Sequence, residues 1–209
     1  MVNRIPSSIH MHLEGTIARV ELWSADGYPR LTRALLGELD DQLDALLADS
    51  DCHGIVLHGS EKCFAAGAEL AEVNALEGIS ALEFGRRGQL LFEKVAGAPK
   101  PVVAAITGHC LGGGFDPALA CQARLAAPTA TFGYPGATLG ILTGWGGTQR
   151  LPRAIGRSQA LELLLSGETV NAERALALGL VDAVVPGEKL LSRAVEHATL
   201  LVERGRSLK

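Results

Sequence analysis

Apolar residues along the chain follow two patterns, one typical of strands and one typical of helices. Apolar and polar residues alternate over 9–13, the apolar residues Ile17, Val20 and Leu22 follow, and Gly15 lies between the two segments, which predicts two strands joined by a tight turn. Leucines recur at helical spacing from Leu31 to Leu47, which predicts an amphipathic helix over 31–49.

The two patterns continue in alternation to the end of the chain. Further strands are predicted over 54–59, 101–108, 123–128, 129–133 and the last part of 171–185. Further helices are predicted over 80–97, 146–166 and 187–205. Two shorter helices are predicted, one from the glycines at 112–114 to about 121 and one in the first part of 171–185. Because strands alternate with helices, we expect a layered α/β fold.

Composition narrows the class of protein. A chain of 209 residues can bury one sizeable core, and 47% hydrophobic with 20% charged residues is typical of a soluble globular protein. The net charge of −4 argues against nucleic acid as a partner, and no apolar run reaches the length of a membrane helix. The N-terminal residues do not resemble a signal peptide. We therefore expect a cytoplasmic protein without a nucleic-acid or membrane partner.

The four cysteines are widely spaced. Cys52, Cys63, Cys110 and Cys121 form no CxxC pair, so the sequence suggests neither a zinc site nor a disulfide framework. We expect buried free thiols and no bound metal.

Two segments that follow predicted strands carry the candidate chemistry. They are "KCFAAGAEL" at 62–70 and "GHCLGGGFD" at 108–116, and both are rich in small residues next to a helix start. Backbone N–H groups are exposed at such a position, and the helix dipole favours negative charge there. Two N–H groups aimed at one point form an oxyanion hole, which stabilises an enolate. The alternative is that the glycines only let a helix pack tightly on a sheet.

Four segments, in order and in spacing, resemble the crotonase superfamily (enoyl-CoA hydratase/isomerase). They are "FAAGAEL", "AITGHCLGGGFD", "TFGYPGATLGILTGWGGTQRLPR" and "NAERALALGLVDAVVP", and the resemblance spans about 9–205. It implies a crotonase-like spiral of repeated ββα units, with a core over 1–186 and a shortened C-terminal helical region over 187–209. It also implies a homotrimer or hexamer that acts on acyl-CoA in fatty acid metabolism. Coenzyme A would be part of the substrate, with no tightly bound cofactor.

The resemblance also implies roles for particular residues. The N–H groups of Ala68 and Gly113 correspond to an oxyanion hole that holds the thioester carbonyl. The other implied substrate-binding positions are Lys62, Phe64, Ala65, Ala66, Leu70, Gly112, Tyr134 and Gly136. Among these, Lys62 is a candidate cation for a phosphate, and a solvated lysine is the alternative.

The sequence departs from the family where hydratases usually carry two glutamates. Asp116 is at the first position and Gly136 at the second, so the departure favours a single acid–base residue, as in isomerases, weak hydratases or decarboxylases. Tyr134 offers a hydroxyl nearby, and the alternative is a tyrosine that serves packing alone. Burial beside an apolar acyl chain would raise the pKa of Asp116. The alternative function is non-catalytic acyl-CoA binding, with Asp116 turned into packing and away from Ala68 and Gly113.

Overall fold

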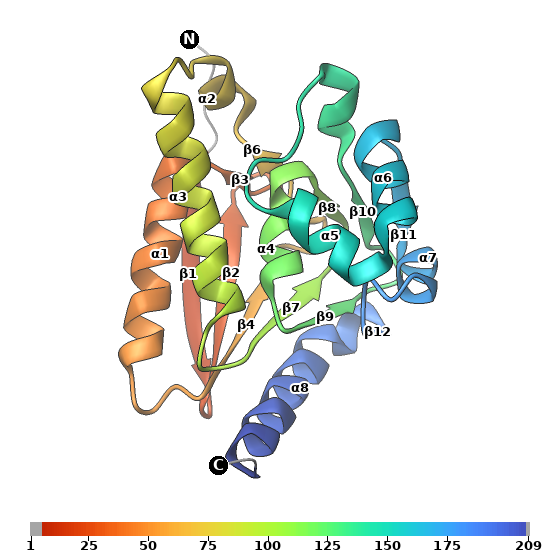
Figure 1. The fold of residues 1–209 in the computed structure, drawn as a ribbon. Helices are drawn as coiled ribbons and strands as arrows, with labels where there is room; N and C mark the ends of the chain where they lie inside the picture. Colours follow the sequence, from red (N-terminus) through yellow and green to blue (C-terminus); the bar gives the residue numbers. More distant parts are fainter. Residues whose placement is uncertain (1–5, 208–209) are drawn as a thin grey trace.

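The computed structural model describes residues 6–207. Residues 1–5 of the predicted core and residues 208–209 of the predicted C-terminal helical region lie outside this described part. The fold is α/β, as predicted, and Figure 1 shows helices packed around strands that run through the centre of the molecule. No helix in this described part is both long and apolar enough to cross a membrane.

The largest sheet contains six strands. They are, in spatial order, β1 (Ser7–Glu14), β2 (Ile17–Ser24), β4 (Gly54–His58), β7 (Val102–Ile106), β9 (Ala123–Ala126) and β12 (Ala183–Val184). The β1–β2 hairpin is antiparallel and the remaining pairs are parallel. Successive side chains of a strand point to opposite faces of the sheet. Ile55 and Leu57 therefore face one core cluster, and Val56 faces another.

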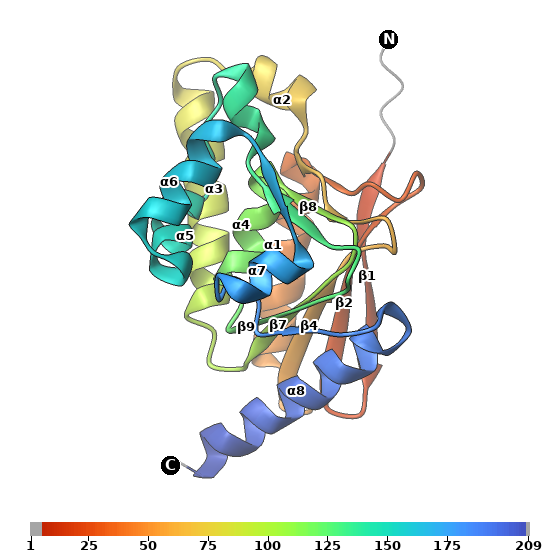
Figure 2. The same ribbon diagram turned by 90° about the vertical axis from the view of Figure 1, so that its right-hand side faces the viewer.

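Helices cover both faces of this sheet. The larger cluster includes side chains from α1 (Arg33–Ala48) and α3 (Ile79–Ala96). The opposite face is covered by α8 (Gly187–Ser207), through Leu190, Ala194 and Ala198. Figures 1 and 2 show α8 at the end of the molecule opposite to α2 (Leu70–Asn74). The proposed division into a core to 186 and a helical segment from 187 stays a prediction.

Short strands form two smaller sheets. One has the order β11 (Thr169–Asn171), β10 (Thr131–Gly133), β8 (His109–Leu111) and β5 (Cys63–Ala65). The other pairs β3 (Arg30–Leu31) with β6 (Gly67–Ala68). In three successive units, β4–β5, β7–β8 and β9–β10, the first strand lies in the large sheet, the shorter second strand lies in the four-stranded sheet, and a helix follows. This is the ββα arrangement expected from the sequence.

The remaining helices follow the short strands. They are α4 (Phe115–Ala120), α5 (Gly147–Ile155), α6 (Arg157–Ser166) and α7 (Ala172–Ala177), with 3-10 turns at Gly112–Gly114 and Pro135–Leu139. The single helix predicted over 146–166 is wrong, because Gly156 adopts φ +83° and separates α5 from α6. The short strands β10 and β12 lie where strands were predicted, whereas β3, β5, β6, β8, β11 and the short helix α2 were not predicted, because such short elements show no periodicity.

Candidate active site

A cavity of about 480 Å³ opens where the short strands turn into helices. Its walls come from the segment after β5, from α3, from the glycine turn after β8, and from the segment between β10 and α5. The lining residues are Ala66, Gly67, Ala68, Leu70, Val73, Leu76, Ala81, Phe84, Gly85, Gly112, Gly113, Tyr134, Pro135, Gly136, Thr138, Leu139, Ile141, Leu142, Thr143, Gly144 and Trp145. None of these is acidic or basic, so the cavity suits an apolar group.

The glycine turn needs bare backbone for a different reason at each position. Gly112 has φ +52°, a conformation that favours glycine. A Cβ on Gly113 would lie 2.7 Å from the ring of Trp145, and a Cβ on Gly114 would lie 2.4 Å from the Ala65 carbonyl oxygen. The turn therefore lets one segment approach β5 and lets an indole ring lie directly against the main chain.

The backbone of Gly113 lies beside that of Ala68. A Cβ on Gly113 would be 3.3 Å from the Ala68 nitrogen, and a Cβ on Gly67 would be 3.5 Å from the Gly113 nitrogen. Both Ala68 and Gly113 line the cavity. The structure thus brings together the two backbone positions that the sequence suggested as an oxyanion hole.

Ala68 is positioned by a second part of the chain. Its strand β6 pairs in parallel with β3, and Leu31 is opposite Ala68 in the register. The turn that leads into β3 is held by Asp26, which accepts hydrogen bonds from the Ser24 hydroxyl (2.7 Å) and the Tyr28 backbone N–H (2.9 Å).

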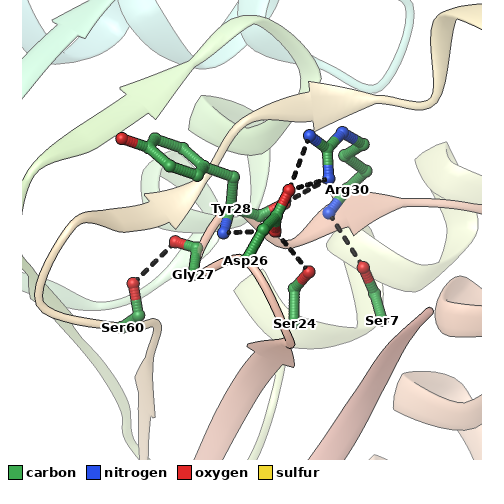
Figure 3. Close-up of polar contacts among 7 residues, drawn as sticks. All are labelled: Ser7, Ser24, Asp26, Gly27, Tyr28, Arg30 and Ser60. Carbon is green, nitrogen blue, oxygen red and sulfur yellow. Dashed lines mark hydrogen bonds and ion pairs between the residues drawn. The ribbon is translucent and has the colours of Figure 1, made fainter. Parts of the chain in front are cut away.

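An ion pair completes this turn. Arg30 donates to Asp26 at 3.0 Å. Desolvation by burial raises the pKa of Asp26, but the hydrogen bonds from Ser24, Tyr28 and Arg30, together with the charge of Arg30, lower this pKa to about 2. The Ser60 hydroxyl donates to the Gly27 carbonyl oxygen, which ties this turn to the segment before β5 (Figure 3). The cluster of Ser24, Asp26, Arg30 and Ser60 therefore fixes the strand against which Ala68 is aligned.

Asp116 is enclosed behind the cavity wall. Its side chain is 0% exposed and is not among the lining residues. The Tyr134 hydroxyl donates to its Oδ1 at 2.8 Å, while the Thr143 hydroxyl and the Trp145 backbone N–H donate to its Oδ2, the latter at 3.2 Å. Both Tyr134 and Thr143 line the cavity. The carboxylate is therefore one hydrogen bond away from the cavity.

Burial dominates the electrostatics of this cluster. Loss of hydration raises the pKa of Asp116 to about 6, although its hydrogen bonds from Thr143, Tyr134 and Trp145 oppose the shift. The upward shift expected from the sequence is confirmed, and its cause is enclosure by protein. Burial and the neighbouring Asp116 carboxylate also hold the pKa of Tyr134 well above its usual value.

The raised pKa of Asp116 predicts a particular dependence of stability on pH. Because the folded state holds this proton more tightly than the unfolded state, the stabilising contribution is complete below about pH 3.8 and is lost as pH rises through about 6. Relative to Asp116→Asn, the wild-type free energy of unfolding should therefore fall by about 3 kcal/mol over this range. Denaturant unfolding of both proteins at several pH values measures the difference, and a constant difference would contradict the prediction.

The structure places the other predicted site residues in two groups. Those that line the cavity with Ala68 and Gly113 are Ala66, Leu70, Gly112, Tyr134 and Gly136. Those that do not are Lys62, Phe64 and Ala65. The side chains of Phe64 and Ala65 are fully buried in the core, so the expectation that they border a ligand is corrected: they support the turn from inside. Lys62 is exposed and lies near Gly27, away from the cavity lining.

Sequence reasoning missed Thr143 and Trp145. Both precede α5, and both contact Asp116 from more than 25 residues along the chain (separations 27 and 29). A tryptophan and a threonine among glycines in "LTGWGG" were the available signal. Leu139 and Leu142 were missed too; they line the cavity with Leu70, and the three side chains are 63%, 58% and 57% exposed.

The four cysteines are free and buried, as predicted. Burial raises the pKa of all four thiols, which makes them poor nucleophiles. Within residues 6–207, no group of three or more His, Cys, Asp or Glu side chains is arranged to hold a metal ion.

Comparisons with known proteins return one consistent family. The family described as "Enoyl-CoA hydratase/isomerase" matches residues 13–208. A "Probable enoyl-CoA hydratase" of Bacillus subtilis is 41% identical over 175 residues, which are 83% of this chain and 67% of that protein. A "Crotonyl-CoA hydratase" of Syntrophomonas wolfei is 40% identical over 176 residues, 84% of this chain and 68% of that protein.

Solved structures show the same likeness. The crystal structure of an enoyl-CoA hydratase from Bacillus anthracis superposes with a TM-score of 0.87 at 36% identity, covering 92% of this chain and 75% of that one. A second structure, from Geobacillus kaustophilus, gives a TM-score of 0.87 at 35% identity over 94% of this chain and 76% of that one. These likenesses confirm the predicted crotonase-like fold.

Proposed function

The chain belongs to the enoyl-CoA hydratase/isomerase family, and on this basis we propose that it binds an acyl-CoA thioester and stabilises the enolate of that thioester. The thioester oxygen accepts hydrogen bonds from the backbone N–H groups of Ala68 and Gly113. Coenzyme A is part of the substrate, with no tightly bound cofactor.

One observation carries this proposal. The backbones of Ala68 and Gly113 lie side by side on an apolar cavity, at a point where a side chain on Gly113 would collide with Trp145. Two main-chain donors at the edge of an apolar cavity are suited to developing negative charge on an oxygen. The apolar walls suit the acyl chain, and the exposed leucines among the lining residues suit the less polar part of the pantetheine arm.

The chemistry that we propose uses a single carboxylate. Gly136 lines the cavity without a side chain, and Asp116 is connected to the cavity wall through its hydrogen bonds to Tyr134 and Thr143. Removal of a proton next to the thioester carbonyl needs one base, whereas two-carboxylate hydration needs a second to activate water. We therefore propose isomerisation, proton exchange or decarboxylation, with weak hydration, although the two relatives from Bacillus subtilis and Syntrophomonas wolfei carry hydratase names.

A second candidate function is acyl-CoA binding without catalysis. It is favoured by the enclosure of Asp116, whose two oxygens both accept hydrogen bonds from protein groups. The oxyanion hole would then serve affinity alone. The trimer or hexamer and the cytoplasmic location expected from the sequence stay predictions.

Binding and proton exchange, measured separately, test the proposal. We expect butyryl-CoA and crotonyl-CoA to bind in calorimetry and the free acids, butyrate and crotonate, not to bind, because recognition needs the thioester carbonyl together with the pantetheine arm. In D₂O, mass spectrometry should detect deuterium entering butyryl-CoA at the carbon next to the carbonyl.

Three outcomes are distinguishable in this experiment. Equal binding, or no binding, of thioesters and free acids would contradict the proposed function. Thioester binding without deuterium exchange would select the non-catalytic alternative. Rapid hydration of crotonyl-CoA, at a rate typical of enzymes, would contradict the single-carboxylate chemistry.

A further inference from the structure

Few cavity-lining side chains can take part in proton transfer. Four of the lining residues carry a polar side-chain atom, namely Tyr134, Thr138, Thr143 and Trp145. The Thr138 hydroxyl donates to the Pro135 carbonyl oxygen at 2.8 Å, and the Trp145 Nε1–H donates to the Phe84 carbonyl oxygen at 3.2 Å. Of these four side chains, only those of Tyr134 and Thr143 donate a hydrogen bond to an ionisable side chain, the carboxylate of Asp116.

The two hydroxyls differ in their access to the cavity. Tyr134 is 3% exposed, its ring packs on Phe115 at 5.2 Å, and a Cβ on Gly147 would lie 2.0 Å from its hydroxyl oxygen. The start of α5 therefore encloses this hydroxyl. Thr143 is half-buried, and its hydroxyl donates its single proton to Asp116, so the lone pairs of its oxygen remain able to accept a proton.

We propose that Thr143 is the catalytic residue that exchanges a proton with the bound substrate, and that Asp116 is a positioning residue that acts through the Thr143 hydroxyl. The inference rests on the proposed function, because it requires a thioester in the cavity. Tyr134 and the Trp145 backbone N–H hold the carboxylate in place behind the wall.

The proton transfer balances without an added reactant. The C–H bond next to the thioester carbonyl breaks, and its proton forms a bond to the Thr143 oxygen while the original Thr143 proton moves to Asp116 Oδ2. The electron pair of the C–H bond moves into the enolate, whose oxygen is held by Ala68 and Gly113. Asp116 becomes a neutral acid, and the reverse transfers return a proton to the same carbon or to another carbon of the enolate system.

Asp116 is the group of this cluster that titrates near neutral pH. The titratable or charged groups around it are Tyr134 after β10, Cys110 on β8 and Arg150 on α5. Burial raises the pKa of Tyr134 and of Cys110 well above their usual values. The exchange rate should therefore follow the ionisation of Asp116, whose pKa is about 6.

Removal of the Thr143 hydroxyl tests this inference. We expect Thr143→Val to lower deuterium exchange into butyryl-CoA by about 100-fold or more, while calorimetry gives a Kd near that of the wild type. Thr143→Ser keeps a hydroxyl and should retain most of the exchange. Thr199→Val removes an exposed threonine hydroxyl on α8 and serves as the matched control. Wild-type exchange should fall as pH drops below about 6.

The outcomes separate this inference from the proposed function. If Thr143→Val exchanges at the wild-type rate, the relay is wrong and the proposed enzyme stands. If the wild type binds thioesters without exchange, the enzyme proposal fails and the relay fails with it. If Thr143→Val does not fold, two other measurements test the relay. The relay is wrong if folded Thr143→Ser exchanges poorly, or if the wild-type exchange rate is independent of pH between about 5 and 8.

Discussion

Gly113→Ala should reduce turnover of an acyl-CoA thioester by about 10²–10³-fold, the magnitude associated with one oxyanion-hole donor. The added methyl group would lie 2.7 Å from Cζ3 of Trp145 and 3.3 Å from the Ala68 nitrogen. It would therefore occupy the corner in which the thioester oxygen accepts its hydrogen bonds. The rate of deuterium exchange into butyryl-CoA, together with the Kd for the same thioester, measures the effect.

A glycine elsewhere in the chain provides the control for this substitution. Gly187 begins α8, and a Cβ there would have no atom within 4 Å, so Gly187→Ala should behave as the wild type. The comparison separates the loss of the oxyanion corner from the general effect of exchanging glycine for alanine. Turnover by a folded Gly113→Ala protein at the wild-type rate would show that the Ala68–Gly113 corner does not hold the reacting oxygen.

Trp145→Ala should lower the free energy of unfolding by about 3–5 kcal/mol, as expected when a large buried aromatic side chain is removed. The indole is 3% exposed, its ring centroid lies 5.1 Å from Phe84 and 6.0 Å from Phe92, and its Nε1–H donates to the Phe84 carbonyl oxygen. A Cβ on Gly88 would lie 2.2 Å from this ring, so α3 is shaped around it. Denaturant unfolding measures the loss.

The other tryptophan gives a matched comparison. Trp23 is half-buried on β2 and stacks on His10 at a centroid distance of 5.0 Å. Trp23→Ala removes the same number of atoms from a site that is open to water, and should destabilise the protein clearly less. Each variant retains one tryptophan, so fluorescence reports on the remaining site. Equal losses at both positions would contradict the proposed role of Trp145 as a central core residue.

Sequence reasoning performed well where a structural feature depends on nearby residues. The helix predicted over 31–49 is α1, from Arg33 to Ala48, because its leucines recur at the spacing of one helix face and Thr32 caps its first turn. It failed at 146–166, where the helical composition of both halves concealed the positive φ of Gly156. The family resemblance implied that Phe64 contacts the ligand, whereas its ring packs inside the core.

The sequence by itself determined the alternation of strands and helices, the two turns rich in small residues, and the presence of Asp116 with no partner carboxylate at Gly136. Each of these depends on the identity of a residue or on its near neighbours. Only the tertiary structure decided that Ala68 and Gly113 lie side by side, and that Asp116 faces Thr143 and Trp145 behind the cavity wall. These contacts join positions tens of residues apart, and they arise because the spiral of ββα units stacks successive strand-to-helix turns at one end of the sheets. No local pattern encodes that proximity, because it depends on how the whole chain packs.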